Sequence, residues 1–204
     1  MAEFSAKDVQ ALRQSTGAGM MDAKKALTAT SGDMDKAADY LREKGIAAAA
    51  KRSDRDQGEG AVGVYMHNQA GRPVLGVLVA LASETDFVAK SDEFKAIAND
   101  IAMHAAAAGP RWINRDDVPE ADVIKEKELI AAQARNEGKP DAIVEKIVEG
   151  RINSFYKDYV LLDQVFVRTD QYEGTVGDMV RELAVKMGEN ISVASMARVS
   201  IGEG

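Results

Sequence analysis

The sequence lacks cysteine altogether and contains only two histidines, His67 and His104, in 204 residues. Without cysteine the chain cannot be a disulfide-stapled scaffold, and this absence fits a reducing compartment. A zinc site needs three or four protein ligands, so a composition with two histidines and no cysteine argues against bound zinc. We expect His104 to be a helix residue near the core.

Long hydrophobic runs are also missing. No segment approaches the roughly 20 apolar residues that span a bilayer, and residues 1–4 show no basic region followed by an apolar stretch. We therefore expect a soluble cytoplasmic protein that makes no membrane contact. With 46% hydrophobic and 29% charged residues, the chain has the composition of a folded globular protein.

The sequence also lacks an excess of positive charge. The chain carries 26 Lys or Arg against 33 Asp or Glu, which gives a net charge of −7. Proteins that hold phosphate backbones are expected to be basic, so we expect no direct binding of nucleic acid. The charge is uneven, because residues 1–52 hold nine basic and seven acidic residues and the remainder is strongly acidic. This asymmetry predicts two modules.

The first module, residues 1–52, is predicted to be three short helices. Ser5 is the expected N-cap of the first helix, because an acidic residue follows three positions later. The glycines that follow this helix predict where it ends. Apolar residues at helical spacing predict a second helix over residues 20–30 and a third that ends near Gly45. The polar segment 53–60, which contains two glycines, predicts a linker.

The second module, residues 61–204, is predicted to be an α/β core. Alternating apolar residues over 62–66 and an almost wholly apolar run over 74–81 predict a β-hairpin. The second of these strands should be central in its sheet and buried on both faces.

Two helices in the second module are expected to pair. Asp117 and Glu120 have the spacing of a capping box that opens a helix ending at Gly138, and a second helix follows Pro140. Residues 120–160 should therefore form a projecting antiparallel helical hairpin. The other expected elements are a helix after Ser91, a short strand over 165–167, a helix capped by Thr175 and a final strand over 191–201. The predicted class is α+β, with a small and mainly antiparallel sheet.

Two patterns that could indicate a cofactor site or a catalytic site are weak signals. Residues 58–63 match Gly-x-Gly-x-x-Gly, but a dinucleotide fingerprint follows a strand and opens a helix, whereas this match follows a linker and opens a strand. We expect no cofactor. Glu84 and Asp86 alternate at the end of a predicted strand and could serve as acid and base, but no Ser, Cys or His nucleophile completes a site. We therefore do not expect an enzyme.

Apolar residues next to turns are more informative. Phe87 beside Asp86 in a strand-to-helix connection forms a wedge with a polar tip, unless its ring folds back into the protein's own core. Met20 and Met21 are consecutive on a helix and cannot both face one core, so one should point outward. An exposed methionine offers an adaptable contact surface. The alternative is ordinary leftover apolar surface on a small bundle.

These residues also carry a resemblance to a known family. The similar segments are Leu12-Arg13, Thr16-Gly17-Ala18-Gly19-Met20-Met21-Asp22, Lys24-Lys25-Ala26-Leu27 and Thr85-Asp86-Phe87-Val88-Ala89. They closely resemble the two signature motifs of bacterial translation elongation factor Ts. Further similar segments, Gly188-Glu189-Asn190-Ile191 among them, follow in family order over nearly the whole chain. The length resembles the short form, in which one α/β subdomain does what two do in longer members.

The resemblance implies a function, the release of GDP from elongation factor Tu so that GTP can rebind. In this family a wedge intrudes near the partner's magnesium site and disturbs its phosphate-binding loop. The corresponding residues of this chain are Thr85, Asp86, Phe87 and Val88. The resemblance implies neither a cofactor nor a catalytic residue.

The resemblance further implies that the N-terminal bundle is ubiquitin-associated-like and grips the partner's nucleotide domain. The residues carried over are Arg13, Met20 and Met21, and more weakly His67, which lies in a core segment that touches another partner domain. Short members also suggest a homodimer. Residues 193–197 stand where a basic pair and a Cys can occur in other short members, so an intersubunit disulfide is excluded.

Two functions from other classes are alternatives to nucleotide exchange. One is a plain adaptor, in which the bundle binds a protein ligand and the core only dimerises. The other is a hydrolase that uses Glu84 and Asp86. Labelled GDP bound to elongation factor Tu separates all three, because only an exchange factor speeds its release.

Overall fold

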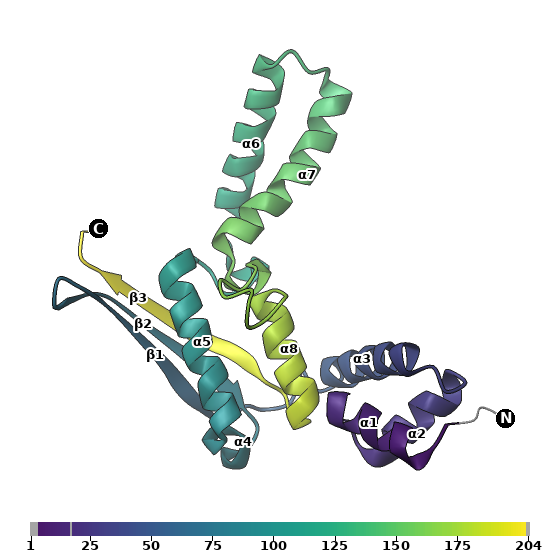
Figure 1. Ribbon diagram of the computed structural model, residues 1–204. Coiled ribbons are helices and arrows are strands. Elements are labelled where there is room, and N and C mark those ends of the chain that lie inside the picture. Colours follow the sequence, from purple (N-terminus) through teal and green to yellow (C-terminus); the bar gives the residue numbers. More distant parts are fainter. Residues whose placement is uncertain (1–3, 17, 203–204) are drawn as a thin grey trace.

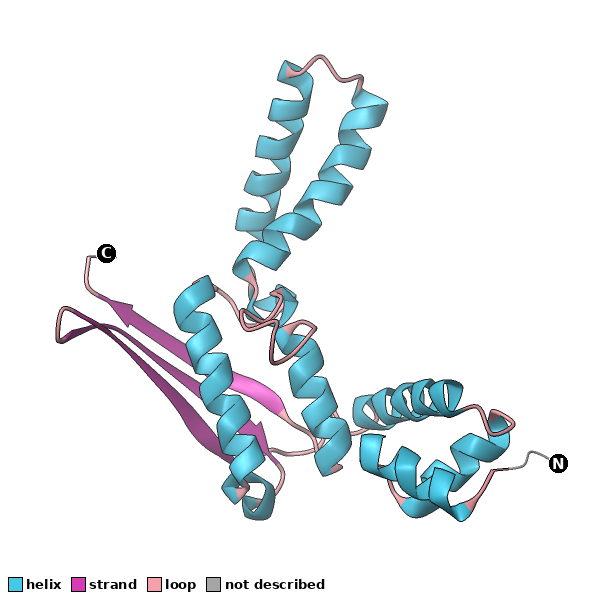
Figure 2. Cartoon of the chain, viewed as in Figure 1, coloured by secondary structure: helices cyan, strands magenta, loops and turns pink. Residues whose placement is uncertain are grey.

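The computed structural model describes residues 4–16 and 18–202 of the chain. They form an N-terminal bundle of helices, a core that combines a three-stranded sheet with helices, and a helical hairpin that stands away from the core (Figure 1). The strands lie together in the core, as Figure 2 shows, so the predicted α+β class is confirmed. Over the described ranges, no helix combines the length and the apolar character needed to cross a membrane.

The bundle contains α1 (Ala6–Thr16), α2 (Met20–Ala29) and α3 (Met34–Ala50). Ser5 caps α1 as predicted, because its hydroxyl donates to Asp8 Oδ2 at 2.8 Å and accepts from Asp8 N at 3.3 Å. The three helices share a small core of their own. Its buried members are Val9, Leu12, Ala23, Ala26, Leu27 and Ala37.

The predicted end of the third helix near Gly45 is wrong, because α3 continues to Ala50. The alanines that follow Gly45 are strong helix formers and carry the helix onward. Gly45 instead lies where α3 meets α8 (Val176–Met187). A Cβ at this position would lie 2.5 Å from Val185 Cγ1, so the glycine permits a close approach of two helices.

The segment between the bundle and the sheet is joined to the core by hydrogen bonds. Asn190 Nδ2 donates to the carbonyl oxygens of Ser53 at 3.0 Å and Arg55 at 2.8 Å. Ser192 Oγ donates to Gln57 Oε1 at 2.7 Å. The linker predicted over 53–60 therefore follows a defined path over the core, although it contains no apolar residue.

The sheet consists of β1 (Glu59–Gln69), β2 (Arg72–Ser83) and β3 (Ser192–Ser200), which are all antiparallel. The order is β1-β2-β3, so β2 is central as predicted. Ala70 and Gly71, both with positive φ of 50° and 79°, form the tight turn between β1 and β2. Two central residues with positive φ match the right-handed twist of the strands that they join.

Only one face of the sheet is covered, which corrects the prediction that the central strand is buried on both faces. Val77, Val79 and Leu81 of β2 are buried, whereas Leu78 between them is 48% exposed. The covering helix α5 (Asp92–Ala108) approaches β1 so closely that a Cβ on Gly63 would lie 2.0 Å from the carbonyl oxygen of Ala98. The core therefore lies between the sheet and the layer of α5 and α8 (Figure 1).

The hairpin contains α6 (Glu120–Asn136) and α7 (Asp141–Tyr159), which pack against each other and project from the core (Figure 1). Each helix buries one narrow stripe. The buried members are Ile130, Ala134, Val144, Ile152 and Phe155. At the base of the hairpin, Arg111 N and Trp112 N both donate to the carbonyl oxygen of Tyr159. These bonds fix the arm to the core.

Two local predictions around the hairpin are wrong. Asp117 does not cap α6 but accepts from Asn114 N at 2.7 Å, which closes the short 3-10 helix Arg115–Asp117. Asn114 is a strong N-cap residue and competes for that carboxylate. Residues 165–167 form no strand, because Val165 makes only a single bridge with Thr175. Thr175 does cap α8 as predicted, in a capping box with Asp178.

Candidate functional site

The connection after β2 is short and is anchored from both sides. It leads from Ser83 into the five-residue helix α4 (Asp86–Lys90). Thr85 is the N-cap, and its Oγ1 accepts from Val88 N at 3.5 Å. Val88 packs against the main core and Ala89 is buried, so the inner side of α4 is held in place.

Phe87 lies on the outer side of α4 and is 84% exposed. The interpretation in which its ring folds back into the protein's own core is therefore wrong. Successive residues of a helix point about 100° apart, so the inward placement of Val88 and Ala89 directs Phe87 away from the core. A large aromatic ring is thus presented to solvent from an anchored loop.

Asp86 begins α4 and pairs with Lys90 four residues later, at 2.5 Å between Oδ2 and Nζ. The hydrogen bond from Lys90 lowers the pKa of Asp86, and the charge of Lys90 adds to the effect. The pair lies at the surface, where water and salt screen it. It can therefore open at little cost when another group approaches Asp86.

The carboxylate of Glu84 interacts with Asn190 and Arg55, whereas that of Asp86 pairs with Lys90. Oε1 of Glu84 accepts from Asn190 N at 2.6 Å, and the same carboxylate also pairs with Arg55. The hydrogen bond from Asn190 is the main reason that the pKa of Glu84 is lowered. Two carboxylates with lowered pKa values provide no proton donor near neutral pH, which argues against the hydrolase hypothesis.

Glu189, in the loop after α8, is the residue of this site that sequence reasoning missed. Its Oε2 accepts from Glu84 N at 3.0 Å and Thr85 N at 3.2 Å. Its Oε1 accepts from Thr85 Oγ1. The only signal in the sequence was the segment Gly188 to Ile191, whose similarity to the family pointed to no role for the glutamate.

The candidate contact residues of the bundle lie at its surface. Met20 is 50% exposed and Met21 is 63% exposed, so both point outward where the helical geometry required only one to do so. Arg13 on α1 is also exposed. Gly17, in the same motif, lies outside the described residues. The bundle thus presents two flexible thioether side chains and a cationic group to solvent.

His67 lies far from Phe87. It pairs with Leu75 in the sheet, whereas the loop that carries Phe87 begins at Ser83. These two positions are eight residues apart on β2, or about 27 Å at about 3.4 Å per residue. The exposed imidazole stacks against Tyr65, whose hydroxyl lies 3.4 Å from His67 Nδ1. The structure therefore places the predicted contact residues in three separate regions.

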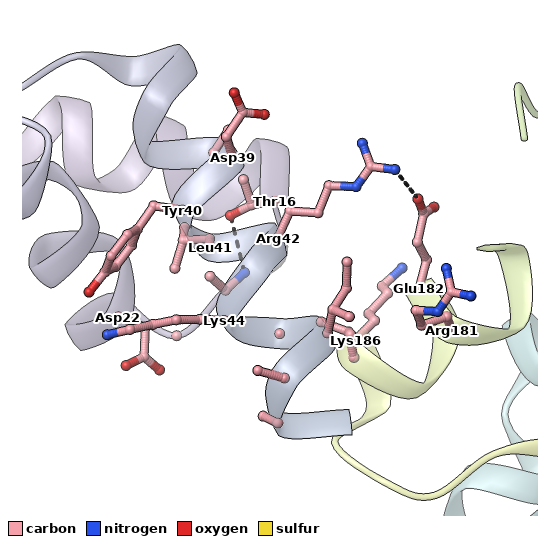
Figure 3. A pocket seen from close by; sticks show the side chains of 18 of the residues that line it. Thr16, Asp22, Asp39, Tyr40, Leu41, Arg42, Lys44, Arg181, Glu182 and Lys186 are labelled. Carbon is pink, nitrogen blue, oxygen red and sulfur yellow. Dashed lines mark hydrogen bonds and ion pairs between the residues drawn. The ribbon is translucent and has the colours of Figure 1, made fainter. Parts of the chain in front are cut away.

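An open pocket of about 950 Å³ lies between the bundle and α8, away from the Phe87 loop (Figure 3). Arg42 of α3 reaches across it towards Glu182 of α8, with 3.8 Å between the charged atoms. Charged side chains of both signs line the opening, including Lys44, Asp178 and Arg181. Ligand sites are usually apolar with a few converging polar groups, so this pocket is better described as a gap between two packed parts.

The second histidine is a core residue, as expected. His104 is fully buried, with Nε2 3.0 Å from Gln164 Oε1, and Nδ1 accepts from Val167 N at 3.2 Å. Burial lowers the pKa of His104, and these partners suit a neutral ring that is protonated at Nε2. Within residues 4–16 and 18–202, no three His, Cys, Asp or Glu side chains gather as metal ligands would.

Comparison with known proteins accounts for this arrangement. The family model described as elongation factor TS matches residues 4–203. The chain belongs to the elongation factor Ts family. Elongation factor Ts of Alkaliphilus oremlandii is 52% identical over 99% of this chain and 91% of its own length. That of Desulforamulus reducens is 51% identical over 100% of this chain and 92% of its own length.

Elongation factor Ts proteins are nucleotide exchange factors that act on elongation factor Tu in translation, and this chain has that role. The two signature motifs of the family correspond to two surfaces on the molecule. One is the exposed start of α2, and the other is the loop that carries Phe87. Each surface presents large exposed side chains, Met20 and Met21 on the first and Phe87 on the second.

Proposed function

We propose that Phe87 and Asp86 form the wedge with which this elongation factor Ts releases GDP from elongation factor Tu. The observation that supports this proposal is the 84% exposure of Phe87, although the residues after it, Val88 and Ala89, are held against the core. An aromatic side chain can bury about 150–250 Å², worth roughly 4–6 kcal/mol at about 25 cal/mol per Å² before ordering costs. In the free protein this contribution is unused.

The wedge acts by differential binding. A protein that binds nucleotide-free elongation factor Tu more tightly than the GDP form weakens GDP binding by the same factor. Phe87 supplies apolar area that is buried only when the partner's nucleotide site has opened. Asp86 can exchange its surface pairing with Lys90 for polar groups near the partner's magnesium site. Thr85 and Val88 hold the two contact residues in place, and no covalent bond is formed or broken.

Residues 1–52 serve as a second grip on the partner's nucleotide domain in this proposal. Arg13, Met20 and Met21 are all exposed on a bundle that has its own core. The bundle supplies affinity for the partner, and the wedge in the core, residues 61–204, supplies exchange. His67 is a weaker third contact in this proposal. Its exposed ring lies near the end of β2 that is remote from the Phe87 loop, so it would meet a different part of the partner.

The experiment compares GDP release by the wild type and by Phe87→Ala. Fluorescent GDP is loaded on elongation factor Tu, and its release is followed after mixing with each protein. We expect Phe87→Ala to slow release at least about tenfold, equivalent to about 1.4 kcal/mol in the transition state. Its melting temperature should stay near that of the wild type, because the ring makes little contact with its own core.

Val165→Ala is the matched control, because Val165 is 59% exposed and lies outside both proposed contact surfaces. It should change neither release nor melting temperature. A Phe87→Ala protein that melts early yet exchanges normally per folded molecule would refute the wedge. Loss of exchange in both variants would show that the effect is not specific to the loop.

We also propose that a second copy of the chain covers the open face of the sheet. Val64, Leu78 and Ala197 form one row across the three strands, and Met66, Gly76 and Val199 form the next. An antiparallel sheet that faces water usually alternates apolar and polar residues, whereas this outer face is largely apolar. The large exposed members are Val62, Val64, Met66, Leu78, Val199 and Ile201. Such a face marks an interface.

A further inference from the structure

Glu189 lies outside the surfaces that contact the partner in the proposal above, yet it is hydrogen-bonded to the loop that carries the wedge. Its carboxylate accepts three hydrogen bonds, from the backbone N–H groups of Glu84 and Thr85 and from Thr85 Oγ1. All three donors belong to the two residues immediately before Asp86. The residues that form this contact are more than 100 positions apart in the chain, so only the tertiary fold brings them together.

The loop depends on such an anchor because α4 is very short. Five residues make little more than one helical turn, which is unstable on its own. The turn is started by Thr85, whose Oγ1 accepts from Val88 N. The direction of Phe87, two residues after Thr85, therefore follows from where Thr85 is held.

The anchor is itself well fixed. Gly188 ends α8 in the left-handed conformation with φ of 73°, which turns the chain so that Glu189 faces the loop. The next residue, Asn190, donates from its backbone N–H to Glu84 Oε1 at 2.6 Å. Residues 84–85 and 189–190 thus hold each other in both directions, with a side chain from each pair accepting from the backbone of the other.

We propose that Glu189 is a positioning residue for nucleotide exchange. It acts through Thr85, holds the start of α4 and keeps Phe87 directed into solvent where the partner can meet it. This inference rests on the wedge proposed above. A positioning role differs from a merely structural one, because loss of Glu189 should then slow exchange by more than the loss of folded protein explains.

Two substitutions of Glu189 separate position from charge. Glu189→Ala removes all three acceptor interactions. Glu189→Gln keeps the two bonds from the backbone N–H groups, which the amide oxygen can accept, and replaces the third by a bond of opposite direction, from the amide NH₂ to Thr85 Oγ1. If the hydrogen bonds position the wedge, Gln should restore exchange; if the negative charge acts on the partner, it should not.

Asp178 offers a matched control at the opposite end of the same helix. Its Oδ2 accepts from Thr175 N at 3.1 Å and from Thr175 Oγ1 at 2.8 Å, which repeats the pattern that Glu189 makes with Thr85. Asp178→Ala therefore removes an equivalent carboxylate–threonine contact without touching the wedge loop.

The experiment measures the release of fluorescent GDP from elongation factor Tu by stopped flow, over a range of elongation factor Tu concentrations. We expect Glu189→Ala to lower the maximal rate about tenfold, with the half-saturating concentration changed less than about threefold, because the bundle still binds. Glu189→Gln should recover most of the rate. Asp178→Ala should melt earlier to an extent similar to Glu189→Ala but exchange normally per folded molecule.

The result that overturns the proposal is equal exchange by Glu189→Ala and Asp178→Ala at matched folded concentration. A Gln variant as slow as the Ala variant would also overturn it. If Glu189→Ala does not fold, Thr85→Val supplies the test, since it removes the hydroxyl that joins Glu189 to the first turn of α4 and should slow exchange. Phe87→Ala in the same series separates the two proposals: normal exchange refutes the wedge, whereas slow exchange beside a normal Glu189→Ala refutes only the positioning role.

Discussion

The rings of Phe87 and His104 lie at opposite extremes of exposure, 84% and 0%. Phe87 makes few contacts within its own protein, so its energetic contribution is reserved for a partner. His104 is held by Gln164 and by the N–H of Val167, and it contributes to the stability of the core. Burial thus decides which of the two rings serves binding and which serves folding.

We predict that His104 makes the fold sensitive to mild acid. Burial lowers the pKa of His104 in the folded state, so the unfolded chain takes up a proton first, near its ordinary pKa of about 6.5. The contribution of neutral His104 is complete above that pH. Below it, the free energy of unfolding should fall by up to about 1.4 kcal/mol per pH unit until the folded ring is protonated as well.

Chemical unfolding of the wild type and of His104→Gln, measured between pH 8 and pH 5, checks this prediction. The variant has no titratable ring at this site, so its disadvantage should shrink as the pH falls through about 6.5. A constant difference between the two proteins over the whole range would contradict the assignment of a buried neutral histidine.

At the scale of elements, the junction of α3 with α8 shows a conflict between local preference and tertiary packing. Gly45 costs helix stability relative to alanine, yet it allows α3 to lie against Val185. Arg52 Nη2 also donates to the carbonyl oxygen of Ala184, and Arg42 pairs with Glu182. This contact sets how the bundle sits on the core.

We predict that the effect of Gly45→Ala depends on residue 185. In the wild type the new methyl group meets stiff Val185, and overpacking of about 1–3 kcal/mol should outweigh the roughly 1 kcal/mol gained in helix propensity. In a Val185→Ala background the clash is relieved, so Gly45→Ala should be neutral or stabilising. A double-mutant cycle of unfolding free energies measures the coupling. Equal effects in both backgrounds would show that the two helices do not pack as described.

The same elements show what the sequence could predict. The caps at Ser5 and Thr175 were predictable because each depends on residues within one helical turn. The sequence suggests a helix end at Gly45, whereas the glycine is needed for close packing against Val185. That contact could not be predicted, because Val185 lies on a helix 140 residues later. Asp117 was assigned to the wrong helix because Asn114 offered a second and better cap within the same segment.

The candidate site divides in the same way. Its motifs identified Phe87, Met20 and Met21, and the structure adds that all three are exposed. The sequence offered no sign that Glu189 holds Thr85, since hydrogen bonds between distant segments leave no periodic pattern. Hydrophobic content alone predicted a strand buried on both faces, and only the topology reveals that one face of β2 is open.

At the scale of the whole molecule, that open face predicts association. We expect the wild type to be a dimer at micromolar concentration and Leu78→Glu to be a monomer, because a carboxylate at the centre of the face would be buried without a partner. Sedimentation velocity measures both. Leu129→Glu on α6 is the control, since Leu129 is similarly exposed, at 52%, but lies on the projecting hairpin. A wild type that stays monomeric would refute this interface.

We expect the wedge to favour nucleotide-free elongation factor Tu over its GDP form. The most direct test is the pair of dissociation constants for these two forms, measured for the wild type and for Phe87→Ala. The wild type should prefer the nucleotide-free form by at least about tenfold, or about 1.4 kcal/mol, and GDP affinity should fall by the same factor. Phe87→Ala should lose most of that preference while its affinity for the GDP form stays nearly unchanged. An unaltered ratio in the variant would show that Phe87 does not provide this preference.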